Sequence, residues 1–311
     1  MRLFRDLERV GRRFPRPYLT LGFFDGVHRG HQEILRRLEV AARANGGTSI
    51  ALTFHPHPAA ILNPARAPLL LTPIRARLQL LAATGVDAIV AQYFSARFAR
   101  LSAEEFVERL LVRAVGIEGV VVGHRVSFGY RRGGNAEVLR DLGRRYGFSV
   151  EVVGPVEVDG TLVSSSAARD RIAQADLVGA RQLLGRWPAV YGRVRHGAQR
   201  GKQLGYPTAN LPVAGMAVPT DGVYATYIRI RDEWLPSVSN LGTNPTFGEN
   251  RRALEVHLLD RQVDLYGERV EVRLLERLRG EVKFESPQAL VEQIGRDVVR
   301  AREVLATTAA E

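Results

Sequence analysis

Leu-Thr-Leu-Gly-Phe-Phe-Asp-Gly-Val-His-Arg-Gly-His, residues 19–31, is the stretch that decides how the first half of the chain folds. An apolar, β-prone run over 18–24 leads into a turn that contains Gly26 and Gly30. A helical pattern follows at once, and its apolar face is formed by Ile34, Leu35, Leu38, Ala41 and Ala42. The stretch therefore predicts a strand, a tight loop and a helix N-terminus in direct succession.

This predicted loop is suited to binding an anion. The first turn of a helix offers unpaired N–H donors and the positive end of the helix dipole. Gly26 and Gly30 would let a phosphate approach the backbone, and His28 and His31 would flank it. A loop with two histidines could also hold a metal or be an ordinary turn, because so short a motif is a weak signal. No cysteine and no nearby acidic cluster supplies further metal ligands, so a phosphate site is favoured.

The spacing His28-x-Gly30-His31 resembles the signature of the nucleotidyltransferase superfamily. Enzymes of this superfamily transfer an AMP or CMP group and release pyrophosphate. The resemblance implies that the two imidazoles stabilise the charge that builds up on the phosphates, which is electrostatic rather than nucleophilic catalysis.

Composition indicates a soluble protein of two domains. A length of 311 residues allows two domains, at roughly 100–200 residues per domain. No apolar run approaches the ~20 residues of a membrane helix, and the N-terminus lacks a signal-peptide core. Cysteine is absent, which excludes disulfides and a thiol nucleophile. We expect a cytoplasmic protein with no membrane partner.

The net charge of +11 raises the question of nucleic acid binding. Only Lys202 and Lys283 are lysines, and the arginines are spread along the chain, often near Glu or Asp. This pattern favours a solvated surface that attracts nucleotides and phosphorylated small molecules. We expect no nucleic acid partner, and the sequence leaves self-association open.

The first 150 residues alternate between apolar strands and amphipathic helices. Further strands are predicted over 48–54, 86–92, 119–123 and 148–153, and helix starts are predicted at Thr72-Pro73, Ser102-x-x-Glu105 and Asn135. Such alternation predicts a doubly wound parallel sheet of Rossmann type, with the first loop near the point where the strand order reverses. His55-Pro56-His57-Pro58 invites a metal interpretation, but the prolines favour a rigid loop at the ligand-binding edge.

A run of hydroxyls, Ser164, Ser165 and Ser166, stands before a predicted helix that carries Arg169 one turn later. Hydroxyls and an arginine fork suit a triphosphate. Serine also caps many helices that bind nothing, so the residues alone leave both interpretations open.

The second half of the sequence is rich in predicted strands and lacks the alternation of strands and helices seen in the first half. Alternating, β-rich runs over 190–196, 223–230, 234–240, 254–259 and 270–276 are separated by Gly and Pro, which predicts an antiparallel β-barrel. Ser286 and Pro287 then begin a closing helix.

A glycine-rich loop lies between the first two of these runs. It contains Gly197, Gly201, Lys202 and Gly205 and can wrap a polyphosphate, although it lacks the Walker pattern. Thr208 and Asn210 are two apart on an extended segment, so both point the same way and offer hard oxygens to Mg²⁺.

Four motifs of the first half resemble, in order, the adenylyltransferase module of bacterial bifunctional riboflavin kinase/FAD synthetases. They are Phe24-Asp25-Gly26-Val27-His28-x-Gly30-His31, Thr53-Phe54-x-Pro56-His57-Pro58, Phe128-Gly129 and Val163-Ser164-Ser165-Ser166-x-x-Arg169. The resemblance implies that ATP is bound by Gly22, Phe24, Asp25, His28, Gly30, His31, Ser164, Ser165 and Arg169. It also implies that FMN is the acceptor and that Phe128 contacts the flavin. One residue departs from the family: Arg125 stands where an acid or amide is usual.

The second half resembles the riboflavin kinase module of the same family. The resemblance rests on Gly205-Tyr206-Pro207-Thr208-Ala209-Asn210, Gly222-Val223-Tyr224, Asn240–Phe247, Leu254-Glu255-Val256-His257, Asp264-Leu265-Tyr266-Gly267 and Leu278-Arg279-x-Glu281-x-Lys283-Phe284. It implies that Glu255 takes the proton from the riboflavin 5′-hydroxyl and that Arg279 contacts the flavin. Read alone, Glu255 could be an outward residue of an alternating strand.

The sequence thus predicts one polypeptide with two activities. Residues 1–186 would adenylylate FMN with ATP to give FAD and pyrophosphate, and residues 187–311 would phosphorylate riboflavin with ATP and Mg²⁺ to give FMN. Neither step uses a protein nucleophile. In an alternative hypothesis only the kinase works, because Arg125 has impaired or redirected the first domain. A nucleotide-sensing or RNA-binding protein on the same folds is a rival that rests on net charge alone.

Overall fold

The structure is a computed structural model that describes residues 1–196, 204–243, 252–261 and 263–310. The chain forms two compact units. The first contains residues 1–68 and 74–164, and the second contains residues 69–73 and those from 165 onward. The described residues include no helix that is long and apolar enough to cross a membrane.

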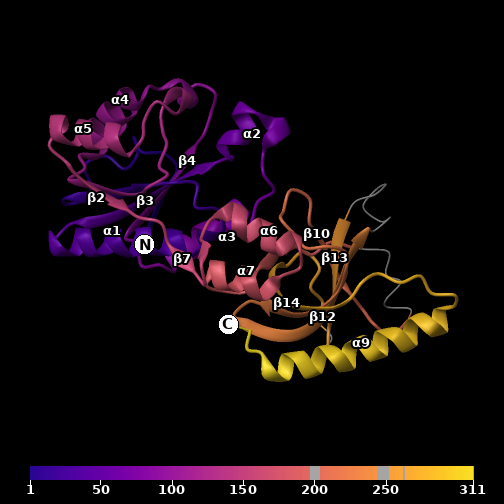
Figure 1. The fold of residues 1–311 in the computed structure, drawn as a ribbon. Coiled ribbons are helices and arrows are strands. Elements are labelled where there is room, and N and C mark those ends of the chain that lie inside the picture. The colour runs from indigo at the N-terminus through magenta and orange to yellow at the C-terminus, as the bar shows by residue number, and fades with distance from the viewer. Residues whose placement is uncertain (197–203, 244–251, 262, 311) are drawn as a thin grey trace. The chain divides into compact units, whose positions relative to one another are not determined.

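The first unit is built on a six-stranded parallel sheet, which confirms the predicted α/β fold (Figure 1). Its strands are β1 (Arg2–Phe4), β2 (Pro17–Leu21), β3 (Thr48–His55), β4 (Ala88–Tyr93), β5 (Gly119–Gly123) and β6 (Ser149–Val153), in the order β1-β4-β3-β2-β5-β6. The sequence predicts five of these strands. It does not predict β1, because three residues are too few to show the alternation of apolar and polar residues that marks a strand. The first predicted strand also ends earlier, at Leu21, because Phe24 is left-handed, with φ 56°.

The strand order reverses between β2 and β5. From β2 the chain moves outward to β3 and β4, and it then returns to place β5 and β6 on the other side of β2. In open α/β sheets ligands bind at the carboxyl ends of the strands beside such a reversal. The loop after β2 carries the two histidines, so the topology puts them at this position.

Helices cover both faces of the parallel sheet (Figure 1). One face packs against α1 (Arg29–Ala44) and α3 (Ile74–Ala82), and the other against η4 (Phe106–Val115), which continues α4 (Ala103–Glu105), and α5 (Ala136–Tyr146). Two of the predicted caps are confirmed here: Ser102 and Glu105 form a capping box, and Asn135 accepts from the N–H of Val138. Shorter elements are η1 (Asp25–Val27), α2 (Pro58–Leu62), η2 (Pro64–Arg66), η3 (Phe98–Arg100), η5 (Tyr130–Arg132), β7 (Glu157–Val158) and β8 (Thr161–Leu162).

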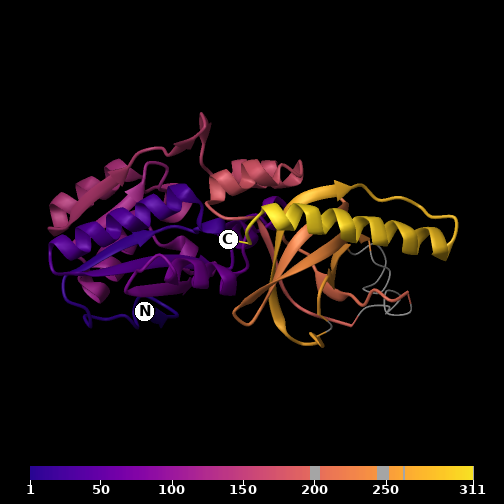
Figure 2. The ribbon, with the colours of Figure 1, turned by 90° about the horizontal axis from the view of Figure 1, so that it is seen from below.

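The second unit contains an antiparallel barrel, as predicted. Its strands are β9 (Ala189–Arg193), β10 (Ala209–Pro212), β11 (Gly222–Ile230), β12 (Glu233–Thr243), β13 (Arg252–Leu258) and β14 (Arg269–Arg279), in the order β10-β13-β12-β11-β14-β9. A bridge between Arg195 and Asn210 brings the two edge strands together, so the barrel is nearly closed. The closing helix α9 (Pro287–Thr307) is capped by Ser286 and lies along the barrel (Figure 2).

Two further helices, α6 (Ser165–Ala173) and α7 (Leu177–Leu184), pack within the second unit. Ala168, Ile172 and Ala180 form a small core with Leu71, and Leu177 belongs to the barrel core. By packing, the division therefore falls between 164 and 165, whereas the sequence suggested a boundary between 186 and 187. The difference arises because α6 packs on α7 and Leu71, and α7 joins the barrel core through Leu177.

Candidate functional sites

The first unit has a cavity of about 220 Å³ at the point of strand reversal. Gly22 follows β2 and Gly123 ends β5, and both line the cavity together with His28, His31 and Ser164. The loop that the sequence predicts as a ligand site after the first strand therefore borders a cavity at the expected edge of the sheet.

His28 joins this cavity to the start of α1. It is the N-cap residue of the helix, and its Nδ1 accepts a hydrogen bond from the backbone N–H of His31 at 3.3 Å. The two imidazoles stack, with ring centres 3.6 Å apart and an angle of 17° between planes. Because Nδ1 of His28 accepts this hydrogen bond, the ring carries a proton on Nε2, at its other edge.

The turn before His28 has an unusual backbone. Phe24, Gly26 and Val27 all have positive φ, at 56°, 79° and 40°. The Phe24 ring packs edge-on against His31 at 5.1 Å. A Cβ atom at Gly30 would lie 3.3 Å from the His28 ring, which is closer than an ordinary contact, so glycine at this position leaves room for the ring.

The described lining of this cavity is positively charged or neutral. It includes His28, His31, His124 and Arg125, and no carboxylate is among the described lining residues. Arg125 is exposed, on the loop after β5. Such a wall suits a polyanion, because phosphate groups are bound by N–H donors and positive charge.

Other predicted residues of the adenylyltransferase site are distributed differently. Ser164 lines the cavity, whereas Ser165 and Arg169 belong to the second unit, where Nε of Arg169 donates to the carbonyl of Leu69 at 2.7 Å. Phe128 is 8% exposed and packs on Phe106, and it lies outside the described lining.

The barrel holds a larger cavity of about 600 Å³. Its lining mixes apolar side chains, among them Val238, Leu290 and Ile294, with Glu255 and Arg279. A cavity with apolar walls and several convergent polar and charged groups is typical of a site for a small organic ligand.

Glu255 lies in the middle of a polar row that crosses three strands. On β13 it pairs with Asn210 of β10 on one side and with Asn240 of β12 on the other. Directly paired residues share one face of a sheet, so the three side chains lie on the face to which the lining residues Glu255 and Asn240 belong. Glu255 alternates along β13 with the buried core residues Leu254 and Val256, so it lies on the strand face opposite to them, and this face borders the cavity.

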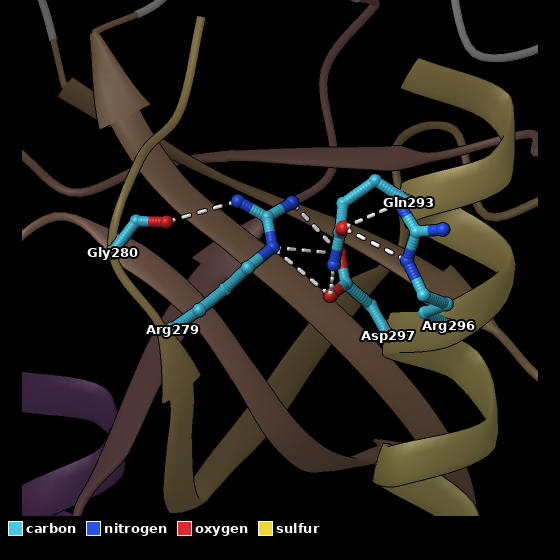
Figure 3. A network of polar contacts seen from close by, with 5 residues as sticks. All are labelled: Arg279, Gly280, Gln293, Arg296 and Asp297. Carbon is cyan, nitrogen blue, oxygen red and sulfur yellow. Dashed lines mark hydrogen bonds and ion pairs between the residues drawn. The ribbon is translucent and has the colours of Figure 1, made fainter. Parts of the chain in front are cut away.

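Arg279 lines this cavity. Its guanidinium is held by Asp297 of α9, as Figure 3 shows. Nε and Nη2 of Arg279 donate to the two carboxylate oxygens of Asp297, at 2.9 and 2.7 Å, and Nη1 donates to the carbonyl of Gly280 at 2.9 Å. Gln293 also donates to Asp297 at 2.9 Å. Sequence reasoning named Arg279 and missed Asp297, which a helical pattern alone marks only as one polar position among several.

A third cavity, of about 350 Å³, lies beside the second. It is lined by Pro207, Leu265 and Tyr266 among others, and Thr208 lines both cavities of the barrel. Gly205, at the start of this segment, is exposed with φ 85°. The predicted polyphosphate residues Gly197, Gly201 and Lys202 lie outside the described residues.

The residues predicted to hold Mg²⁺ fit that ion in kind. Thr208 borders both barrel cavities, and Asn210, which is 4% exposed, stands beside Glu255 across the strand pair. Across the described part of the chain no group of three or more His, Cys, Asp or Glu forms a metal cage. Mg²⁺ is commonly bound by few protein oxygens together with substrate phosphates, which suits this donor set.

Comparison with known proteins gives the same two modules. A family model described as FAD synthetase matches residues 13–167, and one described as riboflavin kinase matches residues 184–305. The chain is 39% identical to the bifunctional riboflavin kinase/FMN adenylyltransferase of Escherichia coli K12, with 93% of each covered, and 40% identical to that of Pseudomonas fluorescens, with 99% of each covered. A crystal structure from Streptococcus pneumoniae, named as a macrolide-efflux protein, is 32% identical with a TM-score of 0.84 over 99% of both chains.

Proposed function

Since the chain belongs to the family of bifunctional riboflavin kinase/FMN adenylyltransferases, it makes FMN and then FAD, and we propose which of its residues perform each reaction. The N-terminal module transfers AMP from ATP to FMN and releases pyrophosphate. The C-terminal module phosphorylates riboflavin with ATP.

In the first reaction the phosphates of ATP occupy the cavity of His28 and His31. A phosphate oxygen of FMN attacks the α-phosphorus, the bond to the bridging oxygen breaks, and pyrophosphate leaves with the electron pair. The Nε2–H of His28, His31 and the N-terminus of α1 stabilise the charge that grows on the phosphates. Gly22, Phe24 and Gly30 line this cavity, and Asp25 contributes to the proposed site from the turn before His28. The observation that carries the proposal is the histidine pair stacked over a helix N-terminus inside a cavity without a described carboxylate.

Ser164, Ser165 and Arg169 complete the ATP contacts in this proposal, and Phe128 contributes to the flavin side. The support for Ser164 is its place in the cavity wall. The other three rest on the family motifs.

In the second reaction riboflavin occupies the large barrel cavity and ATP the neighbouring one. Thr208, which borders both, then marks the point where the hydroxyl meets the γ-phosphate. Glu255 accepts the proton of the 5′-hydroxyl, whose oxygen attacks the γ-phosphorus while ADP leaves. Gly197, Gly201, Lys202 and Gly205 bind the nucleotide, and Arg279, oriented by Asp297, contacts the flavin.

Thr208 and Asn210 supply protein oxygens for Mg²⁺. When bound, the ion would neutralise charge on the ATP phosphates. Asn210 stands beside the base Glu255, so the same strand pair can orient both the metal and the attacking hydroxyl.

We also propose that the protein works in the cytoplasm on riboflavin, FMN and ATP. One experiment tests whether both modules are active. The protein is incubated with riboflavin, ATP and Mg²⁺, and FMN and FAD are then separated by chromatography. Sequential appearance of FMN and FAD is expected. FMN without FAD, also when FMN is supplied, would favour the alternative in which Arg125 has disabled the first module.

A further inference from the structure

Arg77 is a buried cation that the two proposed reactions do not use. It lies on α3, it is 1% exposed, and it is among the largest fully buried side chains of the described residues. A guanidinium in such a place is unusual, because removal of its charge from water is unfavourable.

The contacts of Arg77 go to the ends of two neighbouring strands. Nη2 donates to the carbonyl of Phe54, in β3, at 2.7 Å. The guanidinium carbon lies 3.8 Å from the ring centre of Phe23, which follows β2. Nε and Nη1 are buried and have no hydrogen-bond partner among the described residues. Packing alone would be served better by an apolar side chain.

Asp25 explains a positive charge at this position. Its side chain is 2% exposed, next in the chain to the turn that leads to His28. Burial lowers the pKa of Arg77 to about 10, and the charge of Asp25 acts in the opposite direction. The positive charge of Arg77 therefore offsets part of the negative charge of this buried carboxyl group, which lies in the turn before the cavity proposed to bind the phosphates of ATP.

The segment held by Arg77 also needs support. Phe24, Gly26 and Val27 have positive φ, and such backbone persists only where its surroundings hold it. Phe23 is contacted by three residues. Its ring packs on the Arg77 guanidinium and on the His57 ring, whose centre lies 4.2 Å from that of Phe23. Its carbonyl accepts a hydrogen bond from Thr53 Oγ1 at 2.9 Å.

We propose that Arg77 is a positioning residue of the adenylyltransferase reaction, which offsets the charge of Asp25 and holds the turn at Phe23–Asp25 against the end of β3, so that the histidine cavity can take the phosphates of ATP. The proposal rests on the assignment of ATP to that cavity.

Three variants separate charge from packing. Arg77→Lys keeps the charge, Arg77→Gln keeps an N–H donor without the charge, and Arg77→Met keeps only the bulk. Arg75→Met is the matched control, because Arg75 is exposed on the same helix. The KM for ATP is measured in FAD formation from supplied FMN. The riboflavin kinase rate of the same samples and their melting temperature serve as internal controls.

We expect the KM for ATP in FAD formation to rise about tenfold or more in the Gln and Met variants, and clearly less in Arg77→Lys, with kinase rates unchanged. If Arg77→Met fails to fold, the comparison of Arg77→Lys with Arg77→Gln still tests whether the positive charge is required. Equal performance of Lys and Gln, or a wild-type KM in Gln, would overturn the proposal. A His28→Asn variant assayed in parallel tests the cavity itself. If FAD formation is unchanged in His28→Asn as well as in the Arg77 variants, the assignment of ATP to this cavity is wrong, and not only the role of Arg77.

Discussion

His28 and His31 stack at 3.6 Å, and the backbone of His31 donates to the ring of His28. One side chain therefore takes part in two features of the site: Nδ1 of His28 caps the helix, and the residue lines the cavity proposed to bind the phosphates of ATP. Any substitution of His28 must separate these two features before its effect on catalysis can be interpreted.

His28→Asn is expected to abolish most FAD formation while FMN formation from riboflavin stays near normal. Asparagine is a favoured N-cap residue, so the helix start is retained, whereas His28→Ala loses a cap worth about 1 kcal/mol as well. Loss of one charge-stabilising donor costs on the order of 10²–10³ in rate. FAD and FMN formation are measured by chromatography, with melting temperature as the fold control. FAD synthesis that persists in His28→Asn, and in the His28→Ala/His31→Ala double variant, would remove the histidines from the mechanism.

Arg125 is expected to be tolerated, so that the wild-type protein makes FAD. It lines the cavity with both histidines, and a cation there attracts phosphate. Arg125→Ala should raise the KM for FMN or ATP about tenfold, which corresponds to ~1.4 kcal/mol of binding, with a smaller effect at high salt. Arg140→Ala, on the exposed surface of α5, is the control. Comparison of the two KM values tells which substrate Arg125 contacts. An unchanged KM for both would leave Arg125 without a role in binding.

The sequence predicted those parts of the molecule whose signals are local. The strand over 119–123 was predicted with its observed bounds, and the caps at Ser102, Asn135 and Ser286 were recognised because each residue satisfies backbone donors three positions away. Periodicity also separated the parallel sheet from the barrel. β1 was too short to show a period, and it is held by pairing with β4, more than eighty residues later.

Site residues were predictable where a motif carries them and hidden where long-range packing makes them. The motif around Glu255 named the acid, but its neighbours Asn210 and Asn240 become visible as a row only through strand register. Asp297 and Arg77 lie on helices, and their partners come from other elements. An isolated polar residue in a helical pattern does not reveal such a partner, because the pattern reports only which face is apolar.

Asp297→Asn is expected to weaken riboflavin binding and to destabilise the barrel. The substitution keeps the shape of the side chain but removes the charge that pairs with Arg279, whose side chain is 21% exposed. Loss of one partner of a buried ion pair costs roughly 3–5 kcal/mol, and this partly open pair should lie at or below that range. The KM for riboflavin and the thermal unfolding midpoint are the measurements. Glu303→Gln removes an exposed partner of Arg300 on the same helix and should change neither. A wild-type KM for riboflavin in Asp297→Asn would show that the Asp297–Arg279 ion pair is not needed for flavin binding.

Glu255→Gln is expected to stop FMN production yet leave adenylylation of added FMN intact. Glutamine keeps the shape of the side chain and its place between Asn210 and Asn240, but it cannot accept the hydroxyl proton. Removal of a general base costs roughly 10²–10⁴-fold in rate. The kinase rate is measured at saturating riboflavin, with FAD formation from FMN as the control in the same sample.

Titration with Mg²⁺ distinguishes loss of this base from loss of metal ligands. Thr208→Ala and Asn210→Ala should raise the Mg²⁺ concentration required for half-maximal kinase rate, and excess Mg²⁺ should restore part of that rate, because ATP phosphates supply the remaining ligands. Excess Mg²⁺ cannot replace a proton acceptor, so Glu255→Gln should stay inactive at every concentration. Wild-type kinase turnover in Glu255→Gln would mean that the base is another residue, and the row of Asn210, Glu255 and Asn240 would then have a binding role only.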